Sequence, residues 1–152
     1  MSLRLRRILS RDLAPLARLH AACFPLDAWD ATALAGLLAM RGASGRLAAT
    51  EAGTIVGFLF DLVHGDEAEI LTLGVDPPER RRGVARALLD DLFARARAAG
   101  AKRITLEVAT DNAGALGLYR ACGFRPVGER PGYYQRGAGP RIDAWLLSRE
   151  LD

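Results

Sequence analysis

Cysteine, histidine and long apolar runs are all scarce in this sequence. Two Cys among 152 residues cannot form a disulfide framework, so we expect a reducing, cytoplasmic compartment. No cluster of His and Cys has the spacing of zinc ligands, so no metal site is expected. No apolar run is long enough for a membrane-spanning helix, and residues 1–8 alternate charged with apolar side chains instead of forming the apolar core of a signal peptide.

Lysine is almost absent, and this leaves arginine as the main cation. Lys102 is the only lysine among 21 Lys+Arg, so 21 minus 1 gives 20 arginines. These are scattered, and 18 Asp+Glu reduce the net charge to +3, which argues against direct nucleic-acid binding. Half of the residues are hydrophobic, which excludes a disordered chain. The length is that of one ordinary domain, so we expect a single domain over residues 1–152.

Apolar periodicity separates strands from helices along most of the chain. The expected strands are 3–8, 46–51, 54–63, 67–75, 103–108, 125–130 and 143–150. The expected helices are 13–23, 31–40, 83–99 and 113–121, with loops at 42–45 and, rich in Gly and Pro, between the last two strands. Asp30 is placed to cap the second helix.

The order of these elements predicts a mixed sheet. Three strands over residues 46–75, joined by short turns, favour an antiparallel meander. The following strand–helix–strand succession is a crossover, which makes two strands parallel. We therefore predict an α/β (mixed α+β) fold in three layers, with a central six- to seven-stranded sheet, helices on both faces and the order β-α-α-β-β-β-α-β-α-β-β.

The segment from Asp76 to Arg86 joins an apolar strand to the start of a long helix. A helix start offers unpaired N–H groups and the positive end of the helix dipole, which suit a phosphate. The small residues Gly83 and Ala85 let an anion approach those amides, and the arginines add charge-assisted hydrogen bonds. An ordinary basic turn between strand and helix would show the same residues, and this segment alone does not decide between the two.

Two common phosphate motifs do not fit this sequence. A P-loop needs Gly before its lysine, but Ala101 precedes Lys102. A dinucleotide fingerprint needs further glycines around Gly83, and they are missing. What remains is a pyrophosphate held by backbone amides and arginine, as in a protein that binds coenzyme A.

Glu107 and Tyr119 are the side chains with acid–base potential. In strand 103–108 the even-numbered residues are apolar and share one face, whereas Glu107 projects to the other. Beside a cleft, burial would raise its pKa and suit a general base; the strand alone favours a carboxylate that simply faces water. Tyr119 is either an acid or a core aromatic. Cys23 and Cys122 lack a histidine partner and are interpreted as buried small hydrophobes.

Two motifs together resemble the GNAT superfamily of N-acetyltransferases. The stretch Arg80 to Ala85 resembles its R/Q-x-x-G-x-G/A pyrophosphate loop. The block Leu106 to Phe124, with Leu-Glu-Val, Asn, Leu-Tyr and Cys-Gly-Phe, looks like the same superfamily and, more narrowly, its ribosomal-protein-alanine N-acetyltransferase (RimI-like) branch. The resemblance extends from Leu5 to Leu151 and is densest from Glu69 to Tyr134.

The resemblance implies acetyl-CoA as co-substrate and assigns roles to the matching residues. Glu107 falls on the general base, and Tyr119 on the general acid, which also touches the coenzyme. The other implied coenzyme contacts are Leu73, Gly74, Val75, Arg80, Arg81, Arg82, Gly83, Val84, Ala85, Arg86 and Asn112. At Leu73–Val75 the contact is the backbone, and the N–H of Val75 is expected to polarise the thioester carbonyl.

On the acceptor side, the stretch Arg130 to Tyr134 matches the R-x-x-Y-Y segment of RimI-like proteins. Tyr134 is the expected substrate contact, with a loop aromatic at the core edge as the alternative; Trp29 either lines the acceptor groove or pins its helix. The sequence departs from the pattern in three places: Ala109 replaces an arginine, Ala85 replaces a glycine, and residues 135–141 lack the acidic ending.

These features predict an enzyme that moves an acetyl group from acetyl-CoA directly to a primary amine. The resemblance implies the N-terminal α-amino group of a protein, such as a ribosomal protein that begins with Ala. Lysine side chains or a small-molecule amine are alternatives within the fold. A non-catalytic acyl-CoA-binding module is the alternative of another class.

Overall fold

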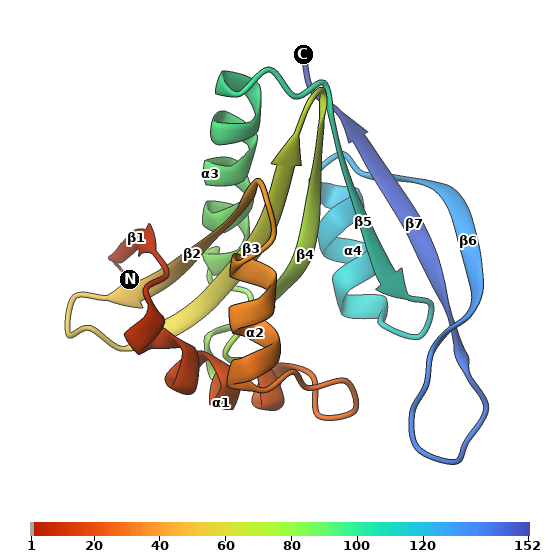
Figure 1. Ribbon diagram of the computed structural model, residues 1–152, viewed down its shortest axis with the longest axis horizontal. Coiled ribbons are helices and arrows are strands. Elements are labelled where there is room, and N and C mark those ends of the chain that lie inside the picture. The colour runs from red at the N-terminus through yellow and green to blue at the C-terminus, as the bar shows by residue number, and fades with distance from the viewer. Residues whose placement is uncertain (1) are drawn as a thin grey trace.

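A computed structural model describes residues 2–152 as a seven-stranded sheet with helices on both faces (Figure 1). The strands are β1 (Leu3–Arg7), β2 (Ala43–Thr50), β3 (Ile55–His64), β4 (Glu67–Val75), β5 (Arg103–Ala109), β6 (Arg125–Tyr134) and β7 (Ile142–Glu150). The helices are α1 (Leu13–Cys23), α2 (Ala31–Leu38), α3 (Val84–Ala98) and α4 (Ala113–Ala121). Short 3-10 turns lie at Ser10–Asp12 and Pro77–Glu79.

The sheet is mixed, in the spatial order β1-β2-β3-β4-β5-β7-β6. Strands β2, β3 and β4 form the predicted antiparallel meander. The crossover through α3 makes β4 and β5 the parallel pair, and β7 and β6 follow as an antiparallel hairpin. The predicted mixed α/β fold and its order of elements are confirmed. Among residues 2–152, no helix is long and apolar enough to span a membrane.

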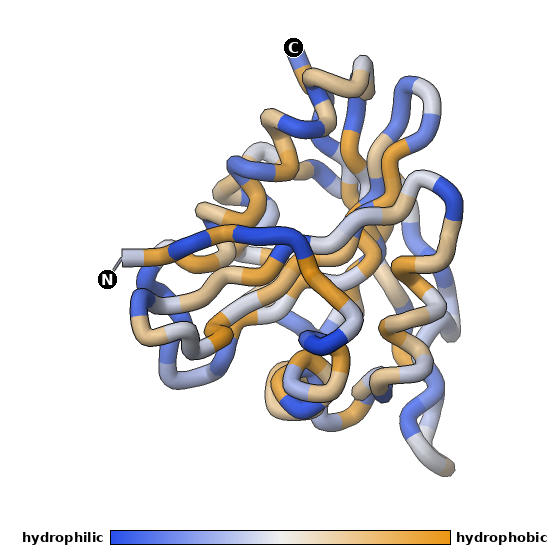
Figure 2. Tube along the Cα trace, turned by 60° about the vertical axis from the view of Figure 1, so that its left-hand side comes forward, coloured by the Kyte–Doolittle hydropathy of each residue, from blue (hydrophilic) through white to orange (hydrophobic). Residues whose placement is uncertain are grey.

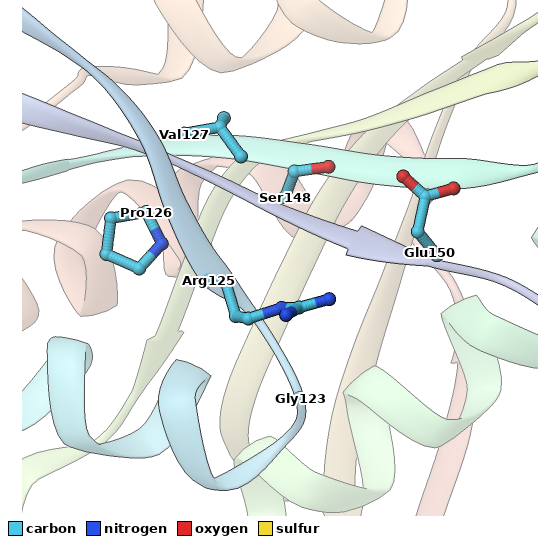
Figure 3. A pocket seen from close by; sticks show the side chains of 6 residues that line it. All are labelled: Gly123, Arg125, Pro126, Val127, Ser148 and Glu150. Carbon is cyan, nitrogen blue, oxygen red and sulfur yellow. The ribbon is translucent and has the colours of Figure 1, made fainter.

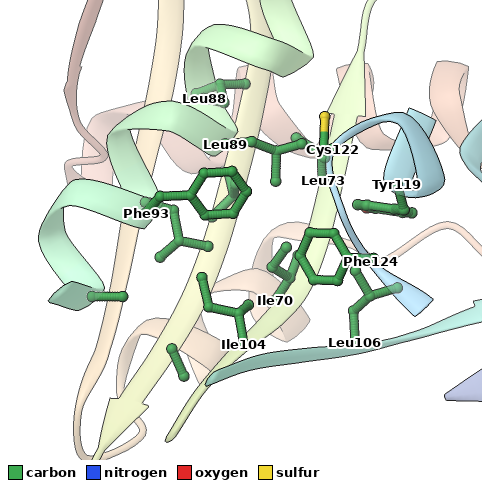
Figure 4. Close-up of a cluster of buried hydrophobic side chains, with 14 of the residues drawn as sticks. Ile70, Leu73, Leu88, Leu89, Phe93, Ile104, Leu106, Tyr119, Cys122 and Phe124 are labelled. Carbon is green, nitrogen blue, oxygen red and sulfur yellow. The ribbon is translucent and has the colours of Figure 1, made fainter. Parts of the chain in front are cut away.

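Two apolar layers cover the two faces of the sheet. Helices α3 and α4 bury the larger cluster (Figure 4). In this cluster Leu88, Leu89 and Leu92, on the apolar face of α3, are fully enclosed. Helices α1 and α2 cover the other face around Leu16 and Leu34. Figure 2 shows apolar residues concentrated along the central strands, while β1 alternates between polar and apolar positions.

Two loop predictions were wrong because backbone pairing continues through them. Residues 43–45 belong to β2, since Ala43 and Gly45 pair with residues at the end of β3. A Cβ at Gly45 would also lie too close to the Ile8 side chain. Strand β6 runs on to Tyr134 although it contains Pro131 and Gly132. Pairing with β7 skips from Arg130 to Tyr134, and the Gly132 N–H donates to Asp143 Oδ1 at 2.8 Å instead of to a strand neighbour. A side-chain acceptor thus replaces the missing ladder bond.

A buried carboxylate fastens β1 to the start of α1. Asp12 is 4% exposed, accepts two hydrogen bonds of 2.9 Å from Arg6 and a third of 2.7 Å from the Leu9 N–H. The Arg6 hydrogen bond holds the pKa of Asp12 below its usual value. A carboxylate stabilised in this way favours the folded state above its unfolded pKa, and the benefit is lost as the pH falls through the lowered, folded pKa.

We expect Asp12→Asn to lower the free energy of unfolding at pH 7 by about 1–3 kcal/mol, because charged hydrogen bonds to Arg6 are lost. Urea denaturation at pH 7 and at pH 3 measures this difference, which should shrink at the lower pH. Asp66→Asn is the control, since the Asp66 side chain lies in an exposed turn. Equal stability of wild type and Asp12→Asn at pH 7 would show that the carboxylate does not hold this junction.

Candidate active site

The parallel strands β4 and β5 separate halfway along their length. Their pairing covers only four positions and ends where Ile70 lies beside Leu106. Beyond that point β4 continues to Val75 and β5 to Ala109 without pairing to each other, and Figure 1 shows the two strands diverging toward the N-terminal end of α3. Because the strands separate, the facing edges of β4 and β5 have no strand partner beyond this point, between the two apolar layers.

A β-bulge in β4 sets which groups face this parting. Phe60 pairs with Thr72 but the next residue, Asp61, pairs with Ile70, so Leu71 is an extra residue in the strand. The Asp76 N–H donates to Val56 of β3 at 2.9 Å. Because N–H groups alternate along a strand, those of Leu73 and Val75 face away from β3, toward the parting.

Gly74 is required at this strand end by close packing. A Cβ at Gly74 would lie 2.5 Å from Phe58 Cζ, closer than real Cβ contacts, and 3.0 Å from Cys23 Sγ, which is also tight. The Val75 carbonyl accepts hydrogen bonds from Arg80 Nε at 3.1 Å and from Cys23 Sγ at 3.3 Å. The end of the predicted backbone segment is therefore held by two side chains, and Cys23 has a structural contact.

Glu107 is the first residue of β5 beyond the last pair with β4. Its side chain is 16% exposed, and Oε1 lies 3.3 Å from Arg130 Nε of the neighbouring hairpin. Oε2 is buried and has no hydrogen-bond partner within residues 2–152. The sequence-based alternative of a carboxylate that simply faces water does not describe this half-satisfied group.

Tyr119 approaches the parting from the opposite face of the sheet. Its ring lies in the cluster under α3 and α4, packed edge-on against Phe124 at 5.5 Å between centroids. Burial, followed by the neighbouring Tyr134, raises the pKa of Tyr119, so the phenol keeps its proton at neutral pH. Glu107 belongs to the other face, where β5 residues alternate. One molecule can touch both side chains only where β4 and β5 have parted.

The segment before α3 holds its arginines around a strained backbone. Arg81 has φ 65°, the one positive φ of a non-glycine residue in the described chain, and Gly83 has φ 84°. Such conformations are costly for residues with a Cβ and concentrate at functional sites. No side chain caps the first turn of α3, so its N–H groups are free to meet an anion.

The side chains of this loop differ in what they can do. Val84 is 1% exposed and packs into the core, so only its backbone can meet a ligand. Arg80 is engaged with the Val75 carbonyl. Arg82 pairs with Glu79 at 3.4 Å, and Arg86 pairs with Asp90 at 3.4 Å. These exposed pairs are weak, which leaves their guanidinium groups available to a phosphate.

Two further predicted residues have structural contacts of their own. Asn112 caps α4, because its Oδ1 accepts from the Ala115 N–H at 3.1 Å, and its amide NH₂ is left to donate elsewhere. The Trp29 ring stacks on the His20 ring at 5.3 Å between centroids, and the Trp29 backbone N–H donates to His20 Nδ1 at 3.1 Å. Burial lowers the pKa of His20 to about 4, so this histidine is neutral and its Nε2–H donates to Thr72 Oγ1 at 3.1 Å. Trp29 thus pins the α1–α2 connection to the bulge of β4.

The end of β6 brings aromatic side chains toward Glu107. Tyr133 and Tyr134 are packed at right angles, 4.9 Å between centroids. Burial raises the pKa of Tyr134 to about 12, and the negative charge of Glu107 is among the further causes. The Glu107 charge is also the second cause, after burial, of the raised pKa of Tyr133. Both phenols therefore lie near enough to feel the Glu107 charge, and both keep their protons at neutral pH.

Comparison with known proteins agrees with this architecture. Residues 10–124 match the acetyltransferase (GNAT) family, three quarters of the chain. The chain belongs to the GNAT family. This confirms the family that the motifs at Arg80–Ala85 and Leu106–Phe124 predicted.

Named relatives lie in the branch that the sequence indicated. The chain is 35% identical over 99 residues to the [ribosomal protein bS18]-alanine N-acetyltransferase of Escherichia coli K12, covering 65% of this chain and 66% of the relative. It is 40% identical over 106 residues to the N-alpha-acetyltransferase RimI of Mycobacterium tuberculosis, covering 67% of this chain and 63% of the relative. The matched stretches thus span just under two thirds of each of these curated relatives.

A solved structure extends the likeness over nearly the whole chain. The crystal structure of the ribosomal-protein-S18-alanine N-acetyltransferase from Escherichia coli superimposes with a TM-score of 0.88 at 25% identity, covering 99% of this chain and 95% of that one. The predicted fold is therefore confirmed by shape as well as by element order.

Sequence reasoning missed Arg130 as a partner of Glu107 in this GNAT-family chain. The register of β5 and β6 against β7 brings the two side chains together. Glu107 pairs with Leu146 of β7, and Arg130 pairs with Ala144 of the same strand. The signal existed in the R-x-x-Y-Y segment, but the skipped residues in β6 hid the register. Arg136, which joins three loops beside Tyr134, was missed for the same reason.

One hollow of the surface lies away from these groups. It is formed by Gly123 with residues of the outer hairpin strands β6 and β7, including Arg125, Ser148 and Glu150 (Figure 3). None of the residues predicted to bind acetyl-CoA or the acceptor lines it. The open parting of β4 and β5, and not this hollow, carries the acid–base groups. Within residues 2–152, no group of three His, Cys, Asp or Glu side chains is placed to hold a metal ion.

Proposed function

We propose that this chain transfers the acetyl group of acetyl-CoA directly to the N-terminal α-amino group of a protein. The observation that carries the proposal is the buried, unpartnered Oε2 of Glu107 at the point where β4 and β5 part, opposite the protonated phenol of Tyr119. An acceptor on one face and a thioester on the other would meet there. The two named relatives are an alanine N-acetyltransferase and an N-alpha-acetyltransferase, which supports the acceptor class.

In this proposal the coenzyme lies along β4 with its diphosphate at the start of α3. The first-turn N–H groups after Gly83 and the guanidinium groups of Arg81, Arg82 and Arg86 would bind the phosphates. The N–H of Val75 faces the parting and would polarise the thioester carbonyl as an oxyanion donor. The Asn112 amide would donate to the coenzyme from the start of α4.

Glu107 and Tyr119 divide the proton transfers. Only a neutral amine is nucleophilic, and a peptide α-amino group has a pKa of about 8, so it needs little help to lose its proton. Glu107 takes this proton before the neutral nitrogen attacks the acetyl carbon, and the bonded nitrogen then gives up a second proton to solvent. As the carbon–sulfur bond breaks, Tyr119 gives its proton to the departing sulfur. The products are the acetylated N-terminus and free coenzyme A.

The acceptor would lie on the α1–α2 side, between Trp29 and Tyr134. We propose a ribosomal protein that begins with Ala, the class named for the Escherichia coli relative. A lysine ε-amine, with a pKa of about 10.4, is harder for the base to deprotonate and is the alternative acceptor within the fold. A binding module without turnover would not need the acid and base on opposite faces of the parting.

Release of free thiol from acetyl-CoA, followed with a thiol-reactive dye, tests the proposal. We expect release in the presence of a peptide with a free N-terminal Ala, and none above the rate of spontaneous hydrolysis with the same peptide N-blocked. Binding of acetyl-CoA without thiol release, for any free-amine peptide, would favour the non-catalytic module and contradict the proposal.

Tyr119→Phe is expected to lower kcat about 10²-fold with little change in the KM for acetyl-CoA, because a proton donor is lost while the packed ring is kept. Steady-state rates over a range of acetyl-CoA concentrations measure both constants. Phe124→Leu is the packing control, because it changes the edge-on contact with the Tyr119 ring and removes no proton donor. An unchanged kcat for Tyr119→Phe would assign Tyr119 to packing alone.

A further inference from the structure

The connection between β6 and β7, residues 135–141, is where this sequence departs from the RimI-like pattern. In Figure 1 it extends beyond the sheet at the same end as the α1–α2 connection and the start of α4. Arg136 of this connection has a side chain that is only 16% exposed, which is low for an arginine in a loop. Its partners explain why it turns inward.

Arg136 binds two carboxylates that come from distant parts of the chain. Nη2 lies 2.9 Å and Nε 3.2 Å from Asp27 Oδ2, in the α1–α2 connection. Nη1 lies 2.6 Å from Asp111 Oδ2, in the turn between β5 and α4. The Arg136 cluster, meaning Arg136, Asp27 and Asp111, therefore joins three loops through one planar group. Asp27 is 22% exposed, so this pair is better shielded from water than a surface ion pair.

The cluster borders the proposed acceptor site on two sides. The Arg136 guanidinium lies 5.6 Å from the centroid of the Tyr134 ring, and the Asp27 charge is a cause, after burial and Tyr133, of the raised pKa of Tyr134. Asp27 lies two residues before Trp29, whose position His20 fixes. The two aromatic residues predicted to contact the acceptor thus belong to segments that Arg136 ties together.

Holding the segments together would matter for binding more than for chemistry. The acid–base groups Glu107 and Tyr119 lie on β5 and α4, which the sheet and the core position without Arg136. Tyr134, at the last paired position of β6, has only one strand neighbour to fix it. A loosened connection would leave the coenzyme side intact and the acceptor groove poorly formed.

We propose that Arg136 is a positioning residue that holds the β6–β7 connection against Asp27 and Asp111, and so sets the affinity for the acceptor. This rests on the proposed function, because it concerns the acceptor side of the same site. The same geometry implies that the acceptor enters between the α1–α2 connection and Tyr134. Arg136 touches neither of the reacting groups.

Kinetics of Arg136→Gln test this proposal. We expect the KM for a free-Ala peptide to rise about tenfold, as for the loss of one charged hydrogen-bond network, with kcat within about twofold. The KM for acetyl-CoA should not change. Asp27→Asn should raise the KM for the peptide by less, because the Asp111 pair is kept, and the double variant should cost no more than Arg136→Gln alone. The KM of Arg136→Lys for the peptide should fall between those of wild type and Arg136→Gln, since an ammonium group cannot span both carboxylates as a guanidinium does.

A second readout needs no acceptor. Hydrogen exchange of the backbone should become faster in segments 24–30, 110–112 and 133–141 of Arg136→Gln, and remain as in wild type elsewhere. Arg4→Gln is the matched control, because it removes the same charge from β1, at the far edge of the sheet. It should leave exchange and all kinetic constants unchanged.

The outcomes separate this proposal from the proposed function. A normal acceptor KM in Arg136→Gln, unchanged exchange, or a lower kcat with unchanged KM would overturn the role of Arg136 alone. Failure of the wild-type chain to acetylate any free-amine peptide would overturn the proposed function, and with it the acceptor-binding role of the cluster.

Discussion

Glu107→Gln is expected to lower kcat by about 10²–10⁴-fold, the usual contribution of a general base. The glutamine amide would keep the shape of the side chain but could not take a proton from the amine. The KM for acetyl-CoA should stay close to that of wild type, because the loop before α3 and the end of β4 are untouched. Raising the pH should restore part of the rate, since more of the acceptor amine is then neutral without a base.

Steady-state kinetics at pH 7 and pH 9, with a free-Ala peptide, measure this effect. Glu129→Gln is the matched control, because Glu129 is an exposed residue of β6 in the same hairpin as Arg130. Loss of the Arg130 pair itself should cost little stability, as Arg130 is 60% exposed. Equal kcat for Glu107→Gln and wild type at pH 7 would remove Glu107 from the mechanism.

Gly83→Val is expected to weaken acetyl-CoA binding by about 10–100-fold, the loss of one or more charged hydrogen bonds to phosphate. Gly83 has φ 84°, and a Cβ there would meet no atom within 4 Å, so the new side chain would project into the open space before α3. A β-branched residue also resists a left-handed backbone. Both effects would displace the N–H groups that are proposed to bind the diphosphate.

The chain offers a control with the same backbone strain. Gly53 has φ 88°, and a Cβ there would likewise meet no atom within 4 Å, but Gly53 lies in the turn before β3. Gly53→Val should lower the melting temperature about as much as Gly83→Val and leave acetyl-CoA affinity unchanged. Calorimetric titration of both variants makes the comparison. If Gly53→Val and Gly83→Val bound acetyl-CoA with equal affinity, the start of α3 would not be the coenzyme-binding site.

The β-α-β core was predictable because local patterns and long-range contacts agree there. The apolar face of α3 that includes Leu88, Leu89 and Leu92 is visible in the sequence and is buried as expected. Asp30 accepts from the Ala33 N–H at 2.8 Å and caps α2 as predicted. Glu107 could be assigned to the face opposite Leu106 from strand alternation alone. Its position at the point where β4 and β5 separate depends on the register between these two strands, which no local sequence pattern encodes.

The hairpin β6–β7 was harder because its sequence contradicts its structure locally. Pro131 and Gly132 predict a break, yet Asp143 supplies the acceptor that lets β6 continue to Tyr134. Arg130 and Arg136 were therefore not recognised as partners of Glu107 and Asp27. The bulge at Leu71 was likewise invisible, because an extra residue in a continuous apolar strand leaves no compositional trace.

Mass spectrometry of a peptide panel tests the proposed direct transfer of an acetyl group to a protein N-terminus. The panel holds peptides with free N-terminal Ala, Ser, Met or Gly, and N-blocked peptides with internal Lys, each incubated with the chain and acetyl-CoA. We expect one added acetyl group on the free α-amine, with Ala preferred, and none on the blocked peptides. Acetylation of blocked Lys peptides, or of no peptide while acetyl-CoA still binds, would contradict it.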